Sequence, residues 1–310
     1  MKVNKIVTLV MLTSVVGSVS AQLPSSGMST SGVLDGVYVK EHIPTKRVIQ
    51  YTHLREADII WAKRVWRTID LREKKNHPLM YPTVPISDRR SLWDVIKYGI
   101  TEERSLTPYE ATDEAGDPND QFDIPITPAN GNVDDPAYKQ KIQELFYDVS
   151  TEAKLDDEGE PIYDEMGNTI DTTIYTPIMA EQIVKYVIKE DWFFDKQRGV
   201  QERRIIGIAP VIYSKDENGD VKGFKTCFWL YFPECRYVFQ NFFVYNTHND
   251  ARRMSFDDLF WKHDYSSYIH KESNVFDRKV SATWEGVDAL LESEKIKKEL
   301  FTIEHDLWHL

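Results

Sequence analysis

The residues closest to a known catalytic motif lie at the end of the chain, in His305-Asp306-Leu307-Trp308-His309. On a helix, two histidines four residues apart share a face and could hold a zinc ion, with the acid between them as a general base for hydrolysis. Asp306 is one methylene shorter than the usual glutamate, only Leu310 follows, and no third ligand is evident. The pattern favours a solvated helix end, and a periplasmic metal-dependent hydrolase stays an alternative.

Three acidic turns, which begin at Asp156, Asp164 and Asp216, are rich enough in carboxylates to suggest Ca²⁺ binding. An EF-hand loop places oxygen ligands at positions 1, 3 and 5 and glycine at position 6. In each of the three turns the glycine comes at the fourth position instead. This mismatch favours ordinary hairpin turns, with a calcium-dependent binding module as the second alternative.

Other catalytic arrangements are weaker. The sequence contains neither a G-x-S-x-G nucleophile motif nor a glycine-rich phosphate loop. Glu190 and Asp191 beside Trp192 could form a carboxylate pair with a raised pKa, but such residues more often end a helix and face water. The sequence therefore predicts no catalytic residue, no cofactor and no bound metal.

The elements that must position any site are organised around residues 186–245, the most aromatic part of the chain. Residues 203–213 and 223–232 read as two strands of a hairpin turned at 217–219, with apolar residues on both faces as in a covered interior strand. Pro210 lacks a ladder donor, which predicts an edge or a bulge there. The predicted fold class is α+β, with a small antiparallel sheet at about 200–245 packed by helices.

Helices are predicted at 52–75, 91–99, 136–148, 176–190, 255–269 and from 285 to the end. The first of these is basic, and we weigh a solvated outer face against a docking surface for an acidic partner or anionic headgroups. In the last helix the expected buried stripe consists of Val287, Leu290, Leu291, Leu300, Ile303 and Leu307.

The N-terminus reads as an export signal over residues 1–21. Lys2 and Lys5 precede an apolar stretch at 6–16, and small residues precede Gln22. The apolar stretch is shorter than the roughly 20 residues that span a membrane. Residues 22–37 are small and polar, which indicates a flexible segment, and 38–310 are expected to form a single α+β domain.

The net charge of −12 argues against nucleic acid as a partner, because phosphate binding needs a basic surface. The acidity is concentrated in residues 102–171, where 20 acidic and 4 basic residues give −16 and leave +4 for the rest of the chain. We therefore expect a long acidic loop insert at 102–171 on a mildly basic body.

Cys227 and Cys235 are the two cysteines of the chain. Eight residues of straight strand would separate them by about 26 Å, whereas a disulfide needs Cα atoms within about 7 Å. The spacing favours two free thiols, and a disulfide remains open because a reversal near Pro233 could bring them together.

Several strings along the chain resemble one family, the GldN/PorN proteins of gliding motility and type IX secretion. The similarity spans about residues 38–285 and matches poorly in the acidic insert. The strings that carry it are Leu71–Asn76 followed by His77-Pro78-Leu79, Tyr186–Asp195, Arg204–Pro210, Trp229–Glu234, Val244–Asn246, Asn249–Ala251, Met254–Phe260 and Ser267–Asn274.

The resemblance implies a non-enzymatic structural subunit of a periplasmic ring or translocon complex. It implies a GldK/PorK-type outer-membrane lipoprotein and a GldM/PorM-type periplasmic domain as partners, together with self-association in the ring. Location in the periplasm would follow, with contact to the outer membrane only through the lipoprotein. No catalytic residue is implied.

Partner contacts are predicted from residue type, since interfaces favour tryptophan, tyrosine and arginine. On the basic segment the candidates are Trp61, Arg64, Arg67 and Arg72. Trp192 and Phe194 are the aromatic candidates, because they lie outside the predicted strands, where burial is not forced.

Overall fold

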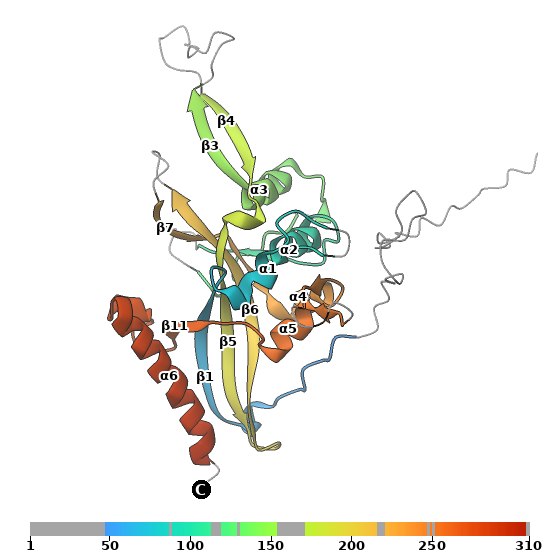
Figure 1. Cartoon of the computed structure of the whole chain (residues 1–310). Coiled ribbons are helices and arrows are strands. Elements are labelled where there is room, and N and C mark those ends of the chain that lie inside the picture. Colours follow the sequence, from blue (N-terminus) through green and yellow to red (C-terminus); the bar gives the residue numbers. More distant parts are fainter. Residues whose placement is uncertain are drawn as a thin grey trace, which may run out of the picture. The chain divides into compact units, whose positions relative to one another are not determined.

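A seven-stranded antiparallel sheet is the centre of the computed structural model (Figure 1). The structure describes residues 47–86, 89–112, 119–128, 131–153, 171–215, 221–246, 249 and 252–307. The strand order is β11 (Tyr268–Glu272), β1 (Ile59–Asp70), β5 (Ile183–Asp195), β6 (Val200–Lys215), β8 (Phe228–Tyr231) and β2 (Pro108–Glu110), with β7 (Val221–Thr226) also paired to β6.

Two small sheets and the helices complete the described part. The sheets pair β3 (Tyr147–Ala153) with β4 (Asp171–Pro177), and β9 (Phe243–Val244) with β10 (Met254–Ser255). The mixture confirms the α+β class, although the main sheet reaches well beyond 200–245. The helices are α1 (His77–Met80), α2 (Leu92–Thr101), α3 (Pro136–Phe146), α4 (Phe232–Phe239), α5 (Phe256–Lys262) and α6 (Gly286–Leu307), with short 3-10 turns η1 (Glu56–Asp58), η2 (Lys74–Asn76), η4 (Ala180–Gln182) and η5 (Val280–Ala282).

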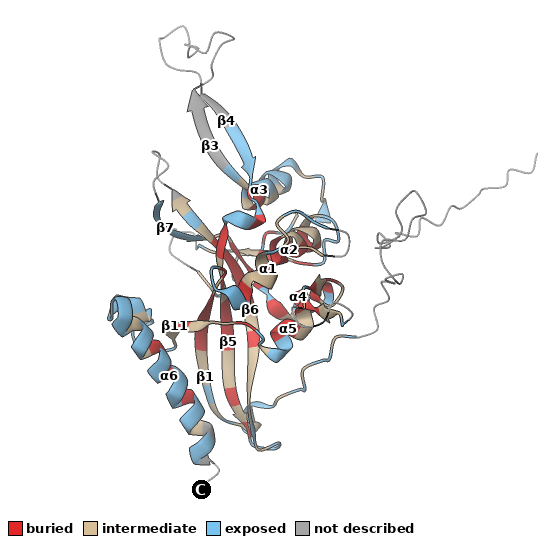
Figure 2. Ribbon diagram, in the orientation of Figure 1, coloured by how far each residue is buried: buried red, intermediate tan, exposed pale blue. Residues whose placement is uncertain are grey.

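The sheet is covered on both faces, which explains why its central strands carry few exposed positions (Figure 2). On one face, Tyr186 and Ile188 of β5 join a buried cluster with residues of α1, α2, α4 and α5. On the other, Val187 packs with Trp66 and Trp229 beneath the segment that follows β2. Burial of this aromatic surface is the main stabilising term.

The helix predicted at 52–75 is wrong, because most of it is strand β1. Trp61, Val65 and Ile69 are spaced by four, and an even spacing also places them on one face of a strand. β1 pairs with β11 on one side and with β5 on the other. These hydrogen bonds to distant segments stabilise the strand over the helix, and no pattern within residues 52–75 predicts them.

The helix predicted at 176–190 is also wrong. Thr176 and Pro177 end β4, a single 3-10 turn follows, and Ile183 begins β5. β-Branched residues such as Ile183, Val184 and Val187 favour a strand that is covered on both faces.

The predicted helix starts are correct where the sequence carries an N-cap residue. Ser91 accepts from the amide of Asp94 and begins α2, and Ser255 with Asp258 forms the predicted capping box of α5. α5 ends at Lys262 rather than near 269, because His263 takes a left-handed conformation with φ 52° and the chain turns into β11. Residues 237–245 hold the end of α4 and the strand β9.

The interruption predicted at Pro210 is confirmed. β6 pairs with β7 from Val211 onward and with β8 at Gly207 and Ile208, so its ladder changes partner at the proline. Between β7 and β8, where the partner changes, the amide of Cys227 donates to the Pro210 carbonyl at 3.0 Å.

Both cysteines are free thiols, as the spacing favoured. Burial raises the pKa of the Cys227 thiol to about 12 and that of Cys235 further. The predicted turn at 217–219 and the acidic turns that begin at Asp156, Asp164 and Asp216 lie outside the described residues.

Candidate interaction surfaces

The six residues predicted to contact partners lie on or beside two neighbouring strands. In the β1–β5 ladder Trp61 is paired with Phe194, and Arg64 is paired with Asp191. Trp192 follows on β5, and Arg67 is further along β1. Arg72 lies in the turn after β1, where it is exposed and bonded to Asp70.

Most of this predicted set is engaged within the fold. Trp61 and Trp192 pack against the buried cluster that anchors α6. Arg67 is 7% exposed and donates to the Ser267 hydroxyl at 3.0 Å. Partner contact through these residues stays a prediction, and in the described arrangement Trp61, Trp192 and Arg67 hold the sheet to its neighbours.

The proposed carboxylate pair is divided between the two faces of β5, since neighbouring strand residues point to opposite sides. Asp191 receives two hydrogen bonds from Arg64, at 2.6 and 2.8 Å. Glu190 is fully buried and accepts from the Trp192 indole at 3.2 Å and the Tyr265 hydroxyl at 3.3 Å. The two carboxylates therefore do not form one site.

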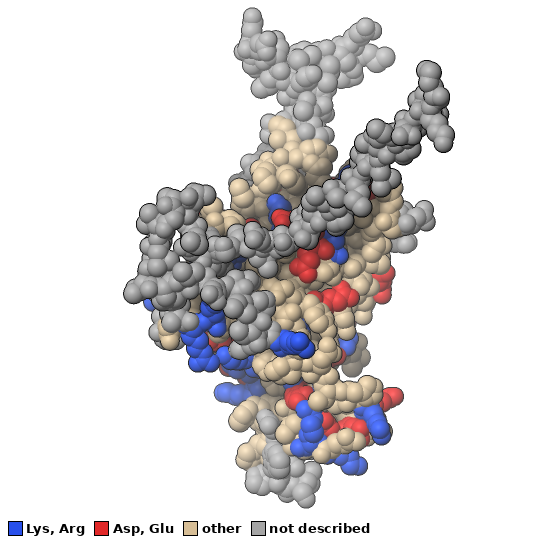
Figure 3. Space-filling model, turned by 90° about the vertical axis from the view of Figure 1, so that its right-hand side faces the viewer, with Lys and Arg blue, Asp and Glu red and all other residues tan. Residues whose placement is uncertain are grey.

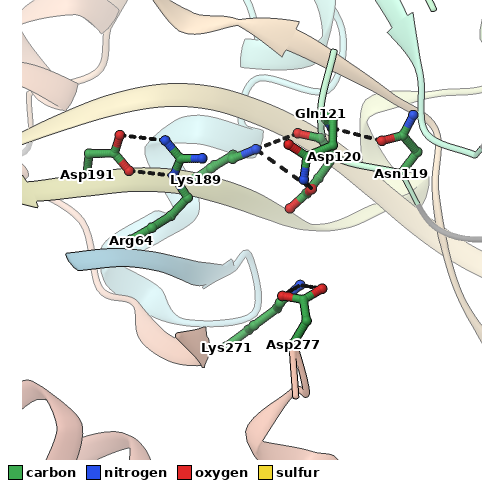
Figure 4. A network of polar contacts seen from close by, with 8 residues as sticks. All are labelled: Arg64, Asn119, Asp120, Gln121, Lys189, Asp191, Lys271 and Asp277. Carbon is green, nitrogen blue, oxygen red and sulfur yellow. Dashed lines mark hydrogen bonds and ion pairs between the residues drawn. The ribbon is translucent and has the colours of Figure 1, made fainter. Parts of the chain in front are cut away.

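Figure 4 shows the charged groups on the Asp191 side of the sheet. Lys189, only 2% exposed, donates to the Asp120 carbonyl at 2.6 Å, with the Asp120 carboxylate 3.7 Å away. Burial lowers the pKa of Lys189. Lys271 pairs with Asp277 at 2.8 Å. Each of these charges has a counter-charge within the chain, so the network stabilises the sheet and its connections.

A second polar cluster fixes the N-terminal described segment to the helices. Tyr51 stacks on Trp261 with ring centroids 5.6 Å apart, and Arg236 lies over both rings. Arg236 also bonds to Asp257 at 2.8 Å and to the Ile49 carbonyl at 2.8 Å. The cavity there is about 250 Å³, and the chain itself satisfies the Arg236 guanidinium.

A larger hollow of about 740 Å³, which we call the basic groove, lies between η2, α1, β10 and α5. Lys75 is bonded to Asp264 at 3.1 Å, and Asp258 is the other acid there. Five cations outnumber these two acids. Figure 3 shows basic side chains gathered along the left-hand margin of the side of the molecule that carries α4 and α5. The cations of the groove are Lys74, Lys75, Arg252, Arg253 and Lys262.

Sequence reasoning found two of the five cations of this groove. Lys74 and Lys75 were among the basic residues of the predicted docking segment. Arg252, Arg253 and Lys262 are 177 to 188 positions further along the chain, and only the packing of α5 beside η2 brings the two groups together. The adjacent basic pairs Lys74-Lys75 and Arg252-Arg253 are the feature of the sequence that could have indicated the groove.

The C-terminal histidine motif is only partly described. His305 lies exposed in the last turn of α6, 3.5 Å from Asp306, and His309 lies outside the described residues. Among the described residues no group of three or more potential ligands is arranged to hold a metal ion.

The described part of the chain contains no helix with the length and apolar character needed to cross a membrane.

Fold and surfaces together define an α+β protein with a hollow rich in cations, the basic groove. Residues 54–309 match the model of the family described as gliding motility associated protein GldN. The chain belongs to this family, which is a structural component of gliding motility and type IX secretion and is not known for enzymatic activity. A comparison with curated proteins found no match.

Proposed function

We propose that the protein is a non-enzymatic structural subunit of a periplasmic ring or translocon complex of the type IX secretion system, supporting protein secretion and gliding. A GldK/PorK-type lipoprotein would hold it at the outer membrane, and a GldM/PorM-type periplasmic domain would contact it. The observation that carries the proposal is the family match, which runs from Leu54 before β1 to the end of α6.

The basic groove is the proposed docking place for an acidic segment of one of these partners. Five cations around an open hollow would attract such a segment and orient it before contact. Apolar surface from Met254 and Leu259 lines the same hollow, so short-range packing can follow the electrostatic attraction. Binding of this kind weakens as salt rises, because exposed charges are screened.

Co-purification with the lipoprotein tests the role. The chain from residue 22 onward is expected to elute with the tagged lipoprotein in an assembly larger than a one-to-one complex. A monomeric chain that is captured neither by the lipoprotein nor by the GldM/PorM-type domain would refute the proposed role.

Charge reversal tests the groove. We expect K74E/R252E/K262E to weaken the affinity for the partner that uses the groove, the lipoprotein or the GldM/PorM-type domain, at least tenfold at physiological salt. The reason is that three exposed cations of the groove become anions. The matched control K196E/K222E/K225E changes the net charge equally at exposed positions outside the groove and should bind as the wild type does. Equal binding by both variants would move the docking place elsewhere and leave the role intact.

A further inference from the structure

α6 carries apolar residues on two opposite faces, and only one face is packed. On the inner face Ile296 and Leu300 are buried with Val65 and Ile269, and the Ile269 amide donates to the Ser293 hydroxyl at 3.0 Å. The rest of the helix is mainly exposed (Figure 2). The predicted buried stripe is therefore wrong at Val287, Leu290 and Leu291, which face outward.

The outer face has a regular spacing. Val287, Leu291 and Phe301 are 71%, 63% and 70% exposed, although side chains of this size are normally buried in a helix that packs. Together with Glu294 and Lys298 they recur at alternating intervals of four and three residues, the spacing of a coiled-coil seam. The helix of 22 residues is about 33 Å long, enough for the whole stripe to meet a second helix.

The order of residue types from Leu291 to Phe301 on this stripe is self-complementary when two copies run antiparallel, and Val287 then lies opposite His305. A two-fold axis at the level of residue 296 places Leu291 of one copy against Phe301 of the other. The same axis places Glu294 against Lys298, and this ion pair occurs twice. A parallel pair would instead oppose two Glu294 carboxylates and two Lys298 ammonium groups, which is repulsive.

The flanks of the stripe do not oppose this pairing strongly. Lys295 and Lys297 border it. Lys295 is bonded to Glu292 of its own copy at 3.2 Å, and Lys297 is bonded at 3.4 Å to Glu294, the carboxylate that also meets Lys298 of the second copy. The helix is already held on the sheet, so association need not pay for folding it.

We propose that the outer face of α6 is a self-association surface, on which a second copy of this chain docks its own α6 in an antiparallel arrangement. The contact is isologous and closes at two copies, so it is separate from any head-to-tail contact that closes a ring. It does not depend on the proposed role in secretion.

Sedimentation of the chain from residue 22 onward, over about 1–100 µM, tests the proposal. A single helix pair is a small interface, so we expect a monomer–dimer equilibrium in about the micromolar range. E294K and K298E should each weaken the dimer at least tenfold, because like charges then meet at the centre. E294K/K298E should restore it to within about threefold, since the ion pairs return with reversed sign. A strictly monomeric wild type, or a double variant as weak as the single ones, would overturn the proposal.

Two controls separate this contact from general effects. E299K makes the same charge change away from the stripe and should dimerise as the wild type does. Chains carrying L291C should form a disulfide with chains carrying F301C when the two are mixed, whereas disulfide bonding within L291C alone would indicate a parallel pair and refute the arrangement. E294K should still co-purify with the lipoprotein, so failure of this contact and failure of the proposed function are distinguishable.

Discussion

Two histidines are held neutral inside the fold. Burial lowers the pKa of His270 to about 3, and nearby Lys279, Lys185 and Lys271 disfavour its charged form further. His270 is also bonded through Nδ1 to the Thr68 hydroxyl at 2.9 Å. His263 has its pKa lowered to about 3 by the same cause, with Arg203 and Arg67 as the neighbouring cations.

These histidines predict a loss of stability in mild acid. The unfolded chain protonates a histidine near its ordinary pKa of about 6.5, whereas the folded chain keeps these two neutral until about pH 3. The unfolded state therefore binds more protons in this window, and the free energy of unfolding falls by at most about 1.4 kcal/mol per histidine and pH unit below 6.5.

Urea unfolding at pH 7, 6 and 5 measures this slope. H270Q should reduce it, because glutamine can bond to Thr68 but does not titrate. H53Q, at an exposed histidine, should leave it unchanged. Equal slopes for all three proteins would contradict a neutral buried His270.

At the scale of the element, strand β6 depends on one position without a side chain. A Cβ on Gly207 would lie 2.5 Å from Cζ of Phe122 and 3.3 Å from Cε3 of Trp229. These rings cover the sheet face opposite the helices, where Trp66 is also buried. Gly207 thus lets the segment after β2 lie directly on β6.

We predict that G207A lowers the free energy of unfolding by about 1–3 kcal/mol, because Phe122 must leave its position to accommodate the methyl group. Gly223 in β7 offers the matched control, since a Cβ there meets nothing within 4 Å. Chemical denaturation of both variants checks this, and a G207A protein as stable as G223A would show that the Phe122 packing is not tight.

At the scale of the whole molecule, the hairpin of β3 and β4 is a sheet of its own. It runs from Tyr147, paired with Pro177, to Ala153, paired with Asp171. Its base is tied to the body by the buried residues Phe146 and Ile178, through a hydrogen bond of 2.8 Å from the Ile178 amide to the Phe146 carbonyl. Neither strand shares a ladder with the seven-stranded sheet.

The rest of the described fold should therefore form without this hairpin. Replacing residues 149–175 by Asn-Gly joins Asp148 to Thr176, which already face each other, through a turn suited to a two-residue hairpin. The melting temperature of the shortened chain is expected to stay within about 2 °C of the wild type, because Phe146 and Ile178 keep their contacts. A fall of 10 °C or more in the melting temperature would mean that residues 149–175 contribute to the core.

By itself the sequence determined the features that depend on neighbours along the chain. Ser91 and Ser255 begin helices because their hydroxyls accept from amides three residues away, and Pro210 interrupts a ladder because it has no N–H. The aromatic stretch at 186–245, the α+β class and the family were evident from the same local strings.

Only the tertiary structure decided whether an apolar pattern formed a helix or a strand, which helix faces were buried and which charged side chains lie together. Trp61, Val65 and Ile69 fit a helix and a strand equally, and pairing with β5 and β11 chose the strand. On α6 two apolar stripes compete, and the sheet buries the one that holds Ile296 and Leu300. The basic groove likewise exists because α5 packs beside η2, a contact between segments that the sequence keeps far apart. Long-range contacts of this kind have no signature in a single chain, because their energy comes from partners that only folding supplies.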